Sequence, residues 1–302
     1  MILITGSTGY IGQHLVRRLI AQGERPRCLV RDPQKAAHLF PGDQIEVVQG
    51  DTTQPATLAE AVKSVETIVH TGFMTADRKE SPGNHYEATN VAGTTNLVKA
   101  AEAAGVRRVI EVSGLGTKPD KPGSYMQGRY LAEKVLKESK LDWTIIQPSV
   151  LFGKNAPFIK GLTDLIQSSP IVPLIGGGKV MFQPISVDDV VSVVLWVLAE
   201  PERSSRQTFT IGGPDYYSFT QIIDALMHAM HKTRLKAPAP LPLVGVGAAV
   251  MEAFLPKPPL TKAAMSLFSF DNTTDLNSVE REFGFTPQSF KHFLESTEMN
   301  HV

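Results

Sequence analysis

Three glycines near the start of the chain carry the most specific chemical signal in the sequence. Gly6, Gly9 and Gly12 follow the apolar run 1–5 (MILIT) and precede a segment of helical spacing that ends at Gly23. A strand, a glycine turn and a helix together present free backbone N–H groups and the positive end of the helix dipole to phosphates. The GxxGxxG spacing therefore predicts a site for the pyrophosphate of a dinucleotide. An ordinary strand-to-helix turn is the alternative.

Charged residues after the second predicted strand bear on which dinucleotide binds. Arg31 follows the strand 26–30 (PRCLV), and Lys35 lies one helical turn further on. In a doubly wound sheet this strand end faces the adenosine ribose, where a cation favours a 2′-phosphate and a carboxylate favours a free 2′-hydroxyl. Arg31 therefore favours NADP(H), while Asp32 keeps NAD(H) open as the alternative.

The next two predicted strands, 44–49 and 66–70, also end in residues suited to a nucleotide. Asp51 could accept a hydrogen bond from an adenine amino group or cap the following turn. The small residues that open the segment 71–73 (TGF) would let a nucleotide lie against the edge of the sheet. We interpret His70 as a packed residue at a strand end rather than a catalyst.

The order of the predicted elements indicates the fold class. Apolar strands alternate with amphipathic helices, which requires a parallel sheet with right-handed crossovers. Strands are expected at 1–5, 26–30, 44–49, 66–70, 108–113 and 142–147, and helices after Gly12 and at 58–62, 84–105 and 125–139. We therefore expect an α/β fold with a Rossmann-type doubly wound parallel sheet, in which residues 1–150 form the NAD(P)-binding domain.

The rest of the chain, residues 151–302, is expected to be a smaller substrate-binding or partner-docking region, interwoven with the first domain and enclosing the substrate cleft with it. Its pattern predicts helices at 158–168, 190–199 and 221–231, strands at 180–185 and 208–212, and a hairpin-like turn at 176–178. The most apolar segment, 241–255, predicts a buried or partner-facing helix. Shallow membrane contact is the alternative, because the segment is too short to span a bilayer.

Composition excludes several classes of protein. The 302 residues include 30 basic and 30 acidic side chains, so no charge excess indicates nucleic-acid binding. The single cysteine, Cys28, rules out an internal disulfide, fits a reducing cytoplasm, and is interpreted as a small buried hydrophobic residue. We expect no leader, because a strand begins at Met1, and no transmembrane segment or metal site. The oligomeric state stays open.

Several of these residues together resemble a known family, the extended or atypical short-chain dehydrogenases/reductases, which are similar to NAD(P)-dependent epimerases and dehydratases. The matching positions are 5–12 (TGSTGYIG), Asp51, the segment around Asn90, 112–113 (VS), 148–149 (PS) and 152–153 (FG). The tail resembles one branch, which includes the nucleotide-binding accessory subunit of respiratory complex I. That narrower likeness lies at 260–261 (LT), 271–272 (DN) and 284–287 (GFTP).

The resemblance implies a set of cofactor contacts, position by position. Those contacts are Gly6, Ser7, Thr8, Gly9, Tyr10, Ile11 and Gly12 around the pyrophosphate, Arg31 at the 2′-phosphate, Asp51 and Thr52 at the adenine, Thr71, Gly72 and Phe73 at the ribose, and Pro148 and Ser149 near the nicotinamide.

The resemblance also implies a catalytic tyrosine with a lysine four residues later. The phenol exchanges a proton as hydride moves, and the cation favours the phenolate and holds the ribose. Tyr125 stands in the expected place, but Arg129 follows it, and a guanidinium is wider than an ammonium and stays protonated. Tyr130 with Lys134 has the same spacing; alignment from the flanking residues favours Tyr125.

The expected serine differs as well. Extended members of the family usually carry two serines after the fifth strand, and the second is catalytic. Here the pair reads Ser113-Gly114, so Ser113 or Thr117 would have to substitute. In the alternative interpretation, Tyr125 is only the aromatic residue that starts a helix and Ser113 only contacts the cofactor backbone.

Three functions follow from these patterns. The first is an oxidoreductase that transfers hydride between NADP(H) and a small apolar carbonyl or alkene substrate, with Tyr125, Arg129 and Ser113 or Thr117 in the site. The second is a non-catalytic NAD(P)H-binding protein with a structural or redox-sensing role, docked on a protein partner through the segment 241–255. The third, a nucleotide-sugar epimerase or dehydratase, is disfavoured because the stretch 236–259 is apolar and rich in proline.

Overall fold

The computed structural model describes residues 1–81, 85–254 and 261–296. The chain divides into two compact units. Unit 1 contains residues 1–74, 80–147 and 190–209, and unit 2 contains residues 75–79, 148–189 and 210–302. Unit 1 is therefore assembled from three separate stretches of sequence.

Unit 1 is built on a parallel sheet of seven strands, which confirms the predicted fold class. The strand order is β3-β2-β1-β4-β5-β6-β11. The strands are β1 (Ile2–Thr5), β2 (Arg27–Val30), β3 (Glu46–Gln49), β4 (Thr67–His70), β5 (Arg108–Val112), β6 (Asp142–Pro148) and β11 (Gln207–Ile211). The order reverses between β1 and β4, and in sheets of this type ligands bind outside the carboxyl ends of the strands at that point.

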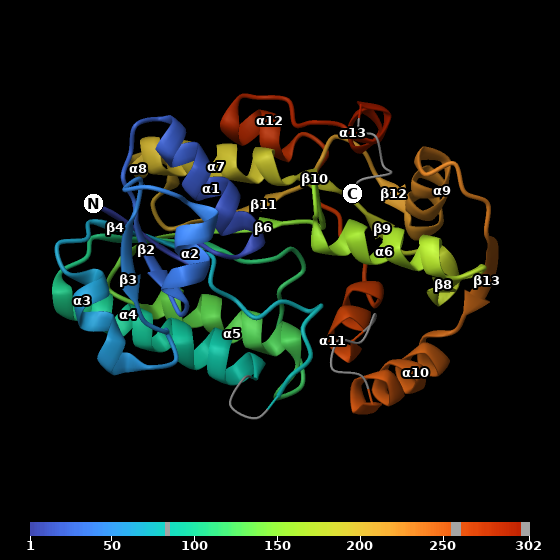
Figure 1. Cartoon of the computed structure of the whole chain (residues 1–302), viewed down its shortest axis with the longest axis horizontal. Coiled ribbons are helices and arrows are strands. Elements are labelled where there is room, and N and C mark those ends of the chain that lie inside the picture. Colours follow the sequence, from blue (N-terminus) through green and yellow to red (C-terminus); the bar gives the residue numbers. More distant parts are fainter. Residues whose placement is uncertain (82–84, 255–260, 297–302) are drawn as a thin grey trace. The chain divides into compact units, whose positions relative to one another are not determined.

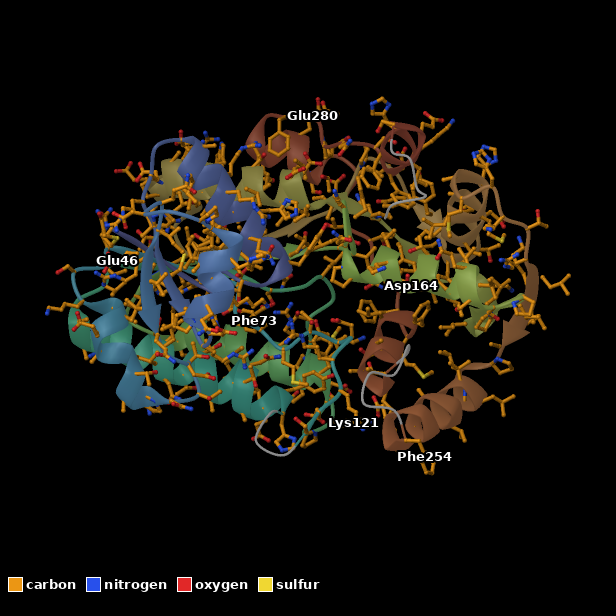
Figure 2. The ribbon with its side chains drawn as sticks, viewed as in Figure 1. Glu46, Phe73, Lys121, Asp164, Phe254 and Glu280 are labelled. Atoms are coloured by element: carbon orange, nitrogen blue, oxygen red, sulfur yellow. The ribbon has the colours of Figure 1, made fainter. Side chains whose placement is uncertain are left out.

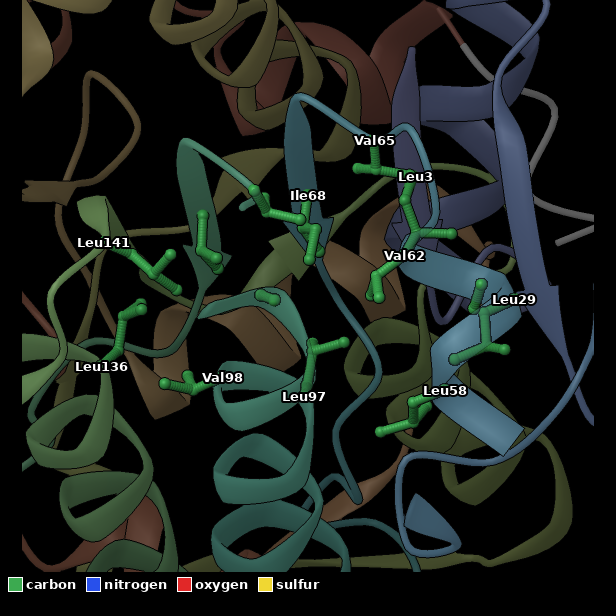
Figure 3. Close-up of a cluster of buried hydrophobic side chains, with 14 of the residues drawn as sticks. Leu3, Leu29, Leu58, Val62, Val65, Ile68, Leu97, Val98, Leu136 and Leu141 are labelled. Atoms are coloured by element: carbon green, nitrogen blue, oxygen red, sulfur yellow. The ribbon is translucent and has the colours of Figure 1, made fainter. Parts of the chain in front are cut away.

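Helices cover both faces of this sheet, as Figure 1 shows. One face carries α3 (Leu58–Val62), α4 (Gly93–Ala104) and α5 (Tyr125–Glu138), and the other carries α1 (Tyr10–Ala21), α7 (Val187–Ala199) and α8 (Pro201–Ser204), while α2 (Pro33–Leu39) follows β2. Figure 3 shows the apolar cluster under the first face, where Leu3 and Ile68 from the strands pack with Leu58, Leu97 and Leu136 from the helices. Burial on both faces explains why the inner strands β1 and β4 are largely apolar.

The helix predicted at 84–105 consists of two parts. A π-helical segment, η2 (Glu87–Ala92), precedes α4, and α4 ends at Gly105 with left-handed backbone. Residue 84, the predicted start, lies outside the described residues. Asn90 holds the loop after β4: its side-chain amide accepts from the Met74 N–H at 2.8 Å and donates to the Met74 carbonyl at 3.1 Å.

Unit 2 contains three small two-stranded pairings. These are β8 (Ile171–Ile175) with β13 (Leu235–Ala239), β9 (Met181–Phe182) with β12 (Tyr217–Ser218), and β7 (Leu151–Phe152) with β10 (Ile185–Ser186). Its helices include α6 (Pro157–Ser168), α9 (Phe219–Ala229), α10 (Leu241–Phe254), α11 (Lys262–Met265), α12 (Ser278–Phe283) and α13 (Phe290–Ser296). Ser218 caps α9 in a capping box, so that predicted helix start is confirmed to within two residues.

Two predictions for unit 2 are wrong. The segment 180–185 is not one strand, because it splits into β9 and β10 around Gln183. The Gln183 side chain donates to the Gly213 carbonyl and accepts from the Thr274 N–H, both at 2.7 Å. At this point a side chain, and not a continuous strand ladder, makes hydrogen bonds to the neighbouring backbone. The turn at 176–178 does not close a hairpin either, since β8 pairs with β13 and β9 pairs with β12. Within the described part of the chain, no helix has the length and apolar character needed to cross a membrane.

Candidate functional site

The glycine turn between β1 and α1 has room for backbone only. Gly6 has a φ of +72°, and a Cβ there would lie 2.6 Å from the Gly72 nitrogen. A Cβ on Gly12 would lie 2.2 Å from the Gly6 carbonyl oxygen. Gly9 is the N-cap of α1, and among the described residues no side chain caps this helix and no acidic residue stands in its first turn. The first N–H groups of α1 are therefore left for an anion, as a pyrophosphate site requires.

The neighbours of this turn are small or buried. The Thr71 hydroxyl donates to the Thr5 carbonyl at 2.9 Å, and Gly72 packs against the Thr5 side chain. Ser7 is fully buried beside the Cys28 thiol, whose pKa burial raises to about 12. The remaining turn residues predicted to contact the cofactor, Thr8, Tyr10 and Ile11, belong to the same turn and the first turn of α1.

The structure also defines the surroundings of the predicted adenosine contacts. Arg31 is exposed directly after β2. Asp32 caps α2, with its carboxylate accepting from the backbone N–H groups of residues 34 and 35 at 3.0 and 3.1 Å. Asp51 accepts from the Thr53 N–H and hydroxyl at 2.9 Å, so its capping role is present. The Thr52 carbonyl accepts from Asn96 of α4.

A row of polar side chains crosses the sheet on the face that α4 and α5 cover. Thr5, His70 and Glu111 pair in register across β1, β4 and β5. The His70 ring nitrogens contact the hydroxyls of Thr5 at 2.5 Å and Thr94 at 3.1 Å. Burial, assisted by the charge of Arg129, lowers the pKa of His70 to about 3, so the ring is neutral at physiological pH.

Tyr125 and Arg129 meet at the start of α5. Ser124 caps this helix, and the Arg129 Nε donates to the Tyr125 hydroxyl oxygen at 3.2 Å. Phe73, labelled in Figure 2, stacks on the guanidinium with its ring centroid 4.6 Å from Cζ, and Tyr86 packs edge-on against the Tyr125 ring. The side chains of Tyr125 and Arg129 are each more than nine-tenths buried. The structure therefore brings this pair together inside an aromatic enclosure.

The alternative pair on the same helix is arranged differently. Lys134 is exposed and forms an ion pair with Glu138 at 3.7 Å. The Lys134 ammonium thus points along the surface of α5, whereas Arg129 is directed inward at Tyr125.

The hydroxyls that could substitute for the expected serine are engaged in internal hydrogen bonds. Ser113 donates to Glu133 at 2.6 Å, and Thr117 donates to the Gly114 carbonyl at 2.7 Å. Glu133 also accepts from Gln147 at 2.8 and 3.0 Å and pairs with the Nζ of Lys137 at 3.3 Å, although it is 3% exposed.

Sequence reasoning missed Glu111. Its side chain is fully buried, and neither carboxyl oxygen has a hydrogen-bond partner within the described ranges. Burial and the nearby charge of Glu133 raise its pKa to about 8. A glutamate between the apolar residues of the strand RVIEVS was the available signal, because a charged residue in a doubly buried strand needs a partner or a proton.

The two predicted nicotinamide contacts stand where β6 ends. Pro148 is the last residue of β6, and the Ser149 N–H donates to the Ile211 carbonyl at 2.9 Å. The Ser149 hydroxyl donates to the Asn272 carbonyl at 2.8 Å. Both bonds lie within unit 2, and they fix the backbone that follows the strand.

The parallel sheet, the reversal of strand order and the glycine turn define a dinucleotide-binding protein of the Rossmann type. The chain belongs to the NAD(P)H-binding family, which matches residues 6–201. The resemblance to extended short-chain dehydrogenases/reductases is thereby confirmed.

Individual proteins of different function are similar to this chain. The mitochondrial NADH dehydrogenase [ubiquinone] 1 alpha subcomplex subunit 9 of Arabidopsis thaliana is 24% identical over 91% of this chain and 69% of its own length. A ceramide reductase of Caulobacter vibrioides is 29% identical over 76% of this chain and 70% of its own length. A solved structure of a nucleoside-diphosphate-sugar epimerase from Staphylococcus aureus superposes with a TM-score of 0.79 at 20% identity, covering 98% of this chain and 99% of that one, and shows the fold alone.

Proposed function

We propose that this protein is an NADP(H)-dependent oxidoreductase that transfers hydride to or from a small apolar carbonyl or alkene substrate. The observation that carries the proposal is the 3.2 Å hydrogen bond between Arg129 and Tyr125 inside the aromatic enclosure. A phenol that already accepts from a permanent cation keeps its own O–H for a substrate, as a general acid requires. The similarity to a ceramide reductase supports the reductase class.

The turn at Gly6, Gly9 and Gly12 would hold the cofactor, because its N–H groups are uncapped by any described side chain and side chains are sterically excluded there. Bound NADPH supplies the hydride from its nicotinamide ring. Arg31 would contact the 2′-phosphate, since it is exposed after β2 while Asp32 is engaged in capping α2. This division of roles favours NADP(H) over NAD(H).

The substitution Tyr125→Phe tests the proposal. We expect it to abolish NADPH-dependent turnover of carbonyl substrates and to leave the Kd for NADPH within about threefold, because the ring stays and only the proton donor is lost. Tyr130→Phe, a few residues later on α5, is the matched control. Full turnover in the Tyr125 variant would remove this residue from the mechanism, and loss in the control alone would transfer the role to Tyr130.

A second candidate function is a non-catalytic NAD(P)H-binding role on a protein partner. It is supported by the exposed apolar side chains of α10, Leu243, Val246 and Phe254, which are 70%, 66% and 82% exposed (Figure 2 labels Phe254). The similarity to a subunit of a respiratory assembly agrees with it. Retention of NADPH through purification without turnover of any carbonyl or alkene substrate would favour this candidate, and ordinary turnover would count against it.

We also propose a reducing compartment, such as the cytoplasm. The support is Cys28, the single cysteine of the chain, which is a buried free thiol.

A further inference from the structure

One edge of the Arg129 guanidinium faces two groups at once. Its Nε is 3.2 Å from the Tyr125 hydroxyl oxygen. A Cβ built on Gly114 would lie 3.3 Å from its Nη2 and 3.8 Å from its Nε. The Nε–Nη2 edge, the phenol and a piece of backbone without a side chain therefore meet at one place. Gly114 does not have left-handed backbone, so its conformation does not require glycine.

The space beside Gly114 is thus reserved by the guanidinium. A side chain at this position would press on Arg129, because 3.3 Å is closer than ordinary van der Waals contact. A shorter cation with a single nitrogen would vacate this space. The glycine at 114 and the arginine at 129 are therefore sterically coupled.

The nearby hydroxyls bond elsewhere. Ser113 donates to the buried Glu133, and Thr117 donates to the Gly114 carbonyl. The Nη1 of Arg129 is buried without a hydrogen-bond partner in the part of the chain that the structure describes. Arg129 is consequently the donor with unused capacity next to the Tyr125 phenol.

We propose that Arg129 itself holds the substrate oxygen, with its guanidinium donating to a carbonyl beside the Tyr125 hydroxyl, while the bare backbone of Gly114 leaves the guanidinium its place. This inference rests on the proposed function and narrows it, because an aldehyde or ketone offers the oxygen that a simple alkene lacks. Arg129 acts as an oxyanion donor in addition to its contact with Tyr125. Gly114 is the residue that makes room for it.

The reduction balances with these groups. Bound NADPH would supply a hydride to the carbonyl carbon and would become NADP⁺, and the electron pair of the C=O π bond would move to the oxygen. That oxygen takes the proton of Tyr125, and the phenolate regains a proton from solvent. Arg129 keeps all its protons and stabilises the negative charge that develops on the oxygen.

A set of four variants tests this assignment: R129K, G114S, G114S/R129K and the matched control G114A/R129K. We expect R129K to lower kcat with aldehydes or ketones by about 100-fold, as loss of one oxyanion donor does. G114S alone lowers kcat because the added side chain displaces the guanidinium. G114S/R129K recovers kcat by about tenfold over R129K, because a hydroxyl then replaces the lost donor in vacated space. G114A/R129K fills the same space without a donor and does not recover.

Two further measurements separate the possible outcomes. The Kd for NADPH, from fluorescence titration, and the thermal midpoint are expected to differ little between the two double variants, so recovery is assigned to the hydroxyl. Equal kcat values for G114S/R129K and G114A/R129K would overturn the inference, as would an R129K effect confined to the Kd for NADPH. If the unmodified protein reduces neither carbonyls nor alkenes, the proposed function and the inference both fail; if it reduces alkenes alone, the proposed function stands and the inference fails. Turnover by the unmodified protein without recovery in the serine variant refutes only the inference.

Discussion

Glu111 and Glu133 place two carboxyl groups inside the face of the sheet that α5 covers. Glu133 accepts hydrogen bonds from Ser113 and Gln147 and forms an ion pair with Lys137. No described residue forms a hydrogen bond with the carboxyl of Glu111. A carboxyl group buried in this way is more stable when protonated. Because its pKa is raised to about 8, the carboxyl of Glu111 changes charge at mildly alkaline pH.

This arrangement predicts a pH-dependent stability. The folded-state pKa of Glu111, about 8, lies above the ordinary value for glutamate, so its contribution is fully present at acidic pH and is lost as the pH rises toward 8. We expect Glu111→Gln to remove this loss, so that the variant gains more than about 1 kcal/mol relative to the unmodified protein between pH 5 and pH 8. Denaturant unfolding at several pH values measures it, with exposed Glu66→Gln as the control. Parallel pH profiles for both proteins would contradict the prediction.

A second residue prediction concerns the cofactor. Arg31→Ala is expected to weaken NADPH binding by about tenfold or more and to leave NADH binding nearly unchanged, because only NADPH carries the 2′-phosphate. Calorimetry with both cofactors measures this, and Arg25→Ala, which removes an exposed arginine paired with Asp43, is the matched control. If NADPH binding does not weaken, the assignment of Arg31 is wrong.

At the scale of elements, the strands of the sheet could be predicted from the sequence, but the polar row that crosses them could not. Apolar runs followed by glycine predict β1 and the turn after it, because local sequence determines both. The row formed by Thr5, His70 and Glu111 depends on the register between strands that are far apart in the chain. The bond of Ser113 depends in the same way on Glu133, a side chain that only the fold brings near.

The turn between β1 and α1 gives the prediction at this scale. Gly12→Ala places a methyl group 2.2 Å from the Gly6 carbonyl oxygen, which must distort the turn. We expect the affinity for NADPH to fall by about tenfold or more and the stability to fall by about 1–3 kcal/mol. Gly161→Ala in α6 meets no atom within 4 Å and is the control, expected to be neutral or slightly stabilising. Fluorescence titration and thermal unfolding compare the two, and unchanged NADPH affinity in the first variant would contradict a role for the turn.

At the scale of the molecule, unit 1 depends on a segment from the later part of the sequence. Residues 190–209 belong to it, and from this segment Ser204 accepts from Arg108 at 2.7 Å while its carbonyl accepts from Thr144 at 2.6 Å. Val193, Val194 and Val197 of the same segment are fully buried. Periodicity indicated the helix but carried no information about which face of which sheet it covers.

We therefore expect a fragment of residues 1–150 not to fold by itself, since removal of this segment uncovers one apolar face of the sheet and leaves buried Arg108 without Ser204. Circular dichroism would show no cooperative thermal transition, and NADPH would not bind. The whole chain, prepared in parallel, is the control. A fragment that binds NADPH as tightly as the whole chain would refute the dependence.

Cys28 lies in β2 beside Ser7, and it is the only sulfhydryl in the chain. The reactivity of its thiol therefore reports local opening at the nucleotide-binding edge of the sheet. A buried thiol of such high pKa reacts with alkylating reagents only when the sheet opens next to the glycine turn, so the labelling rate reflects how readily this region opens. The rate of labelling, followed by mass spectrometry with and without NADPH, would thus show how strongly the bound nucleotide suppresses local opening at this edge of the sheet.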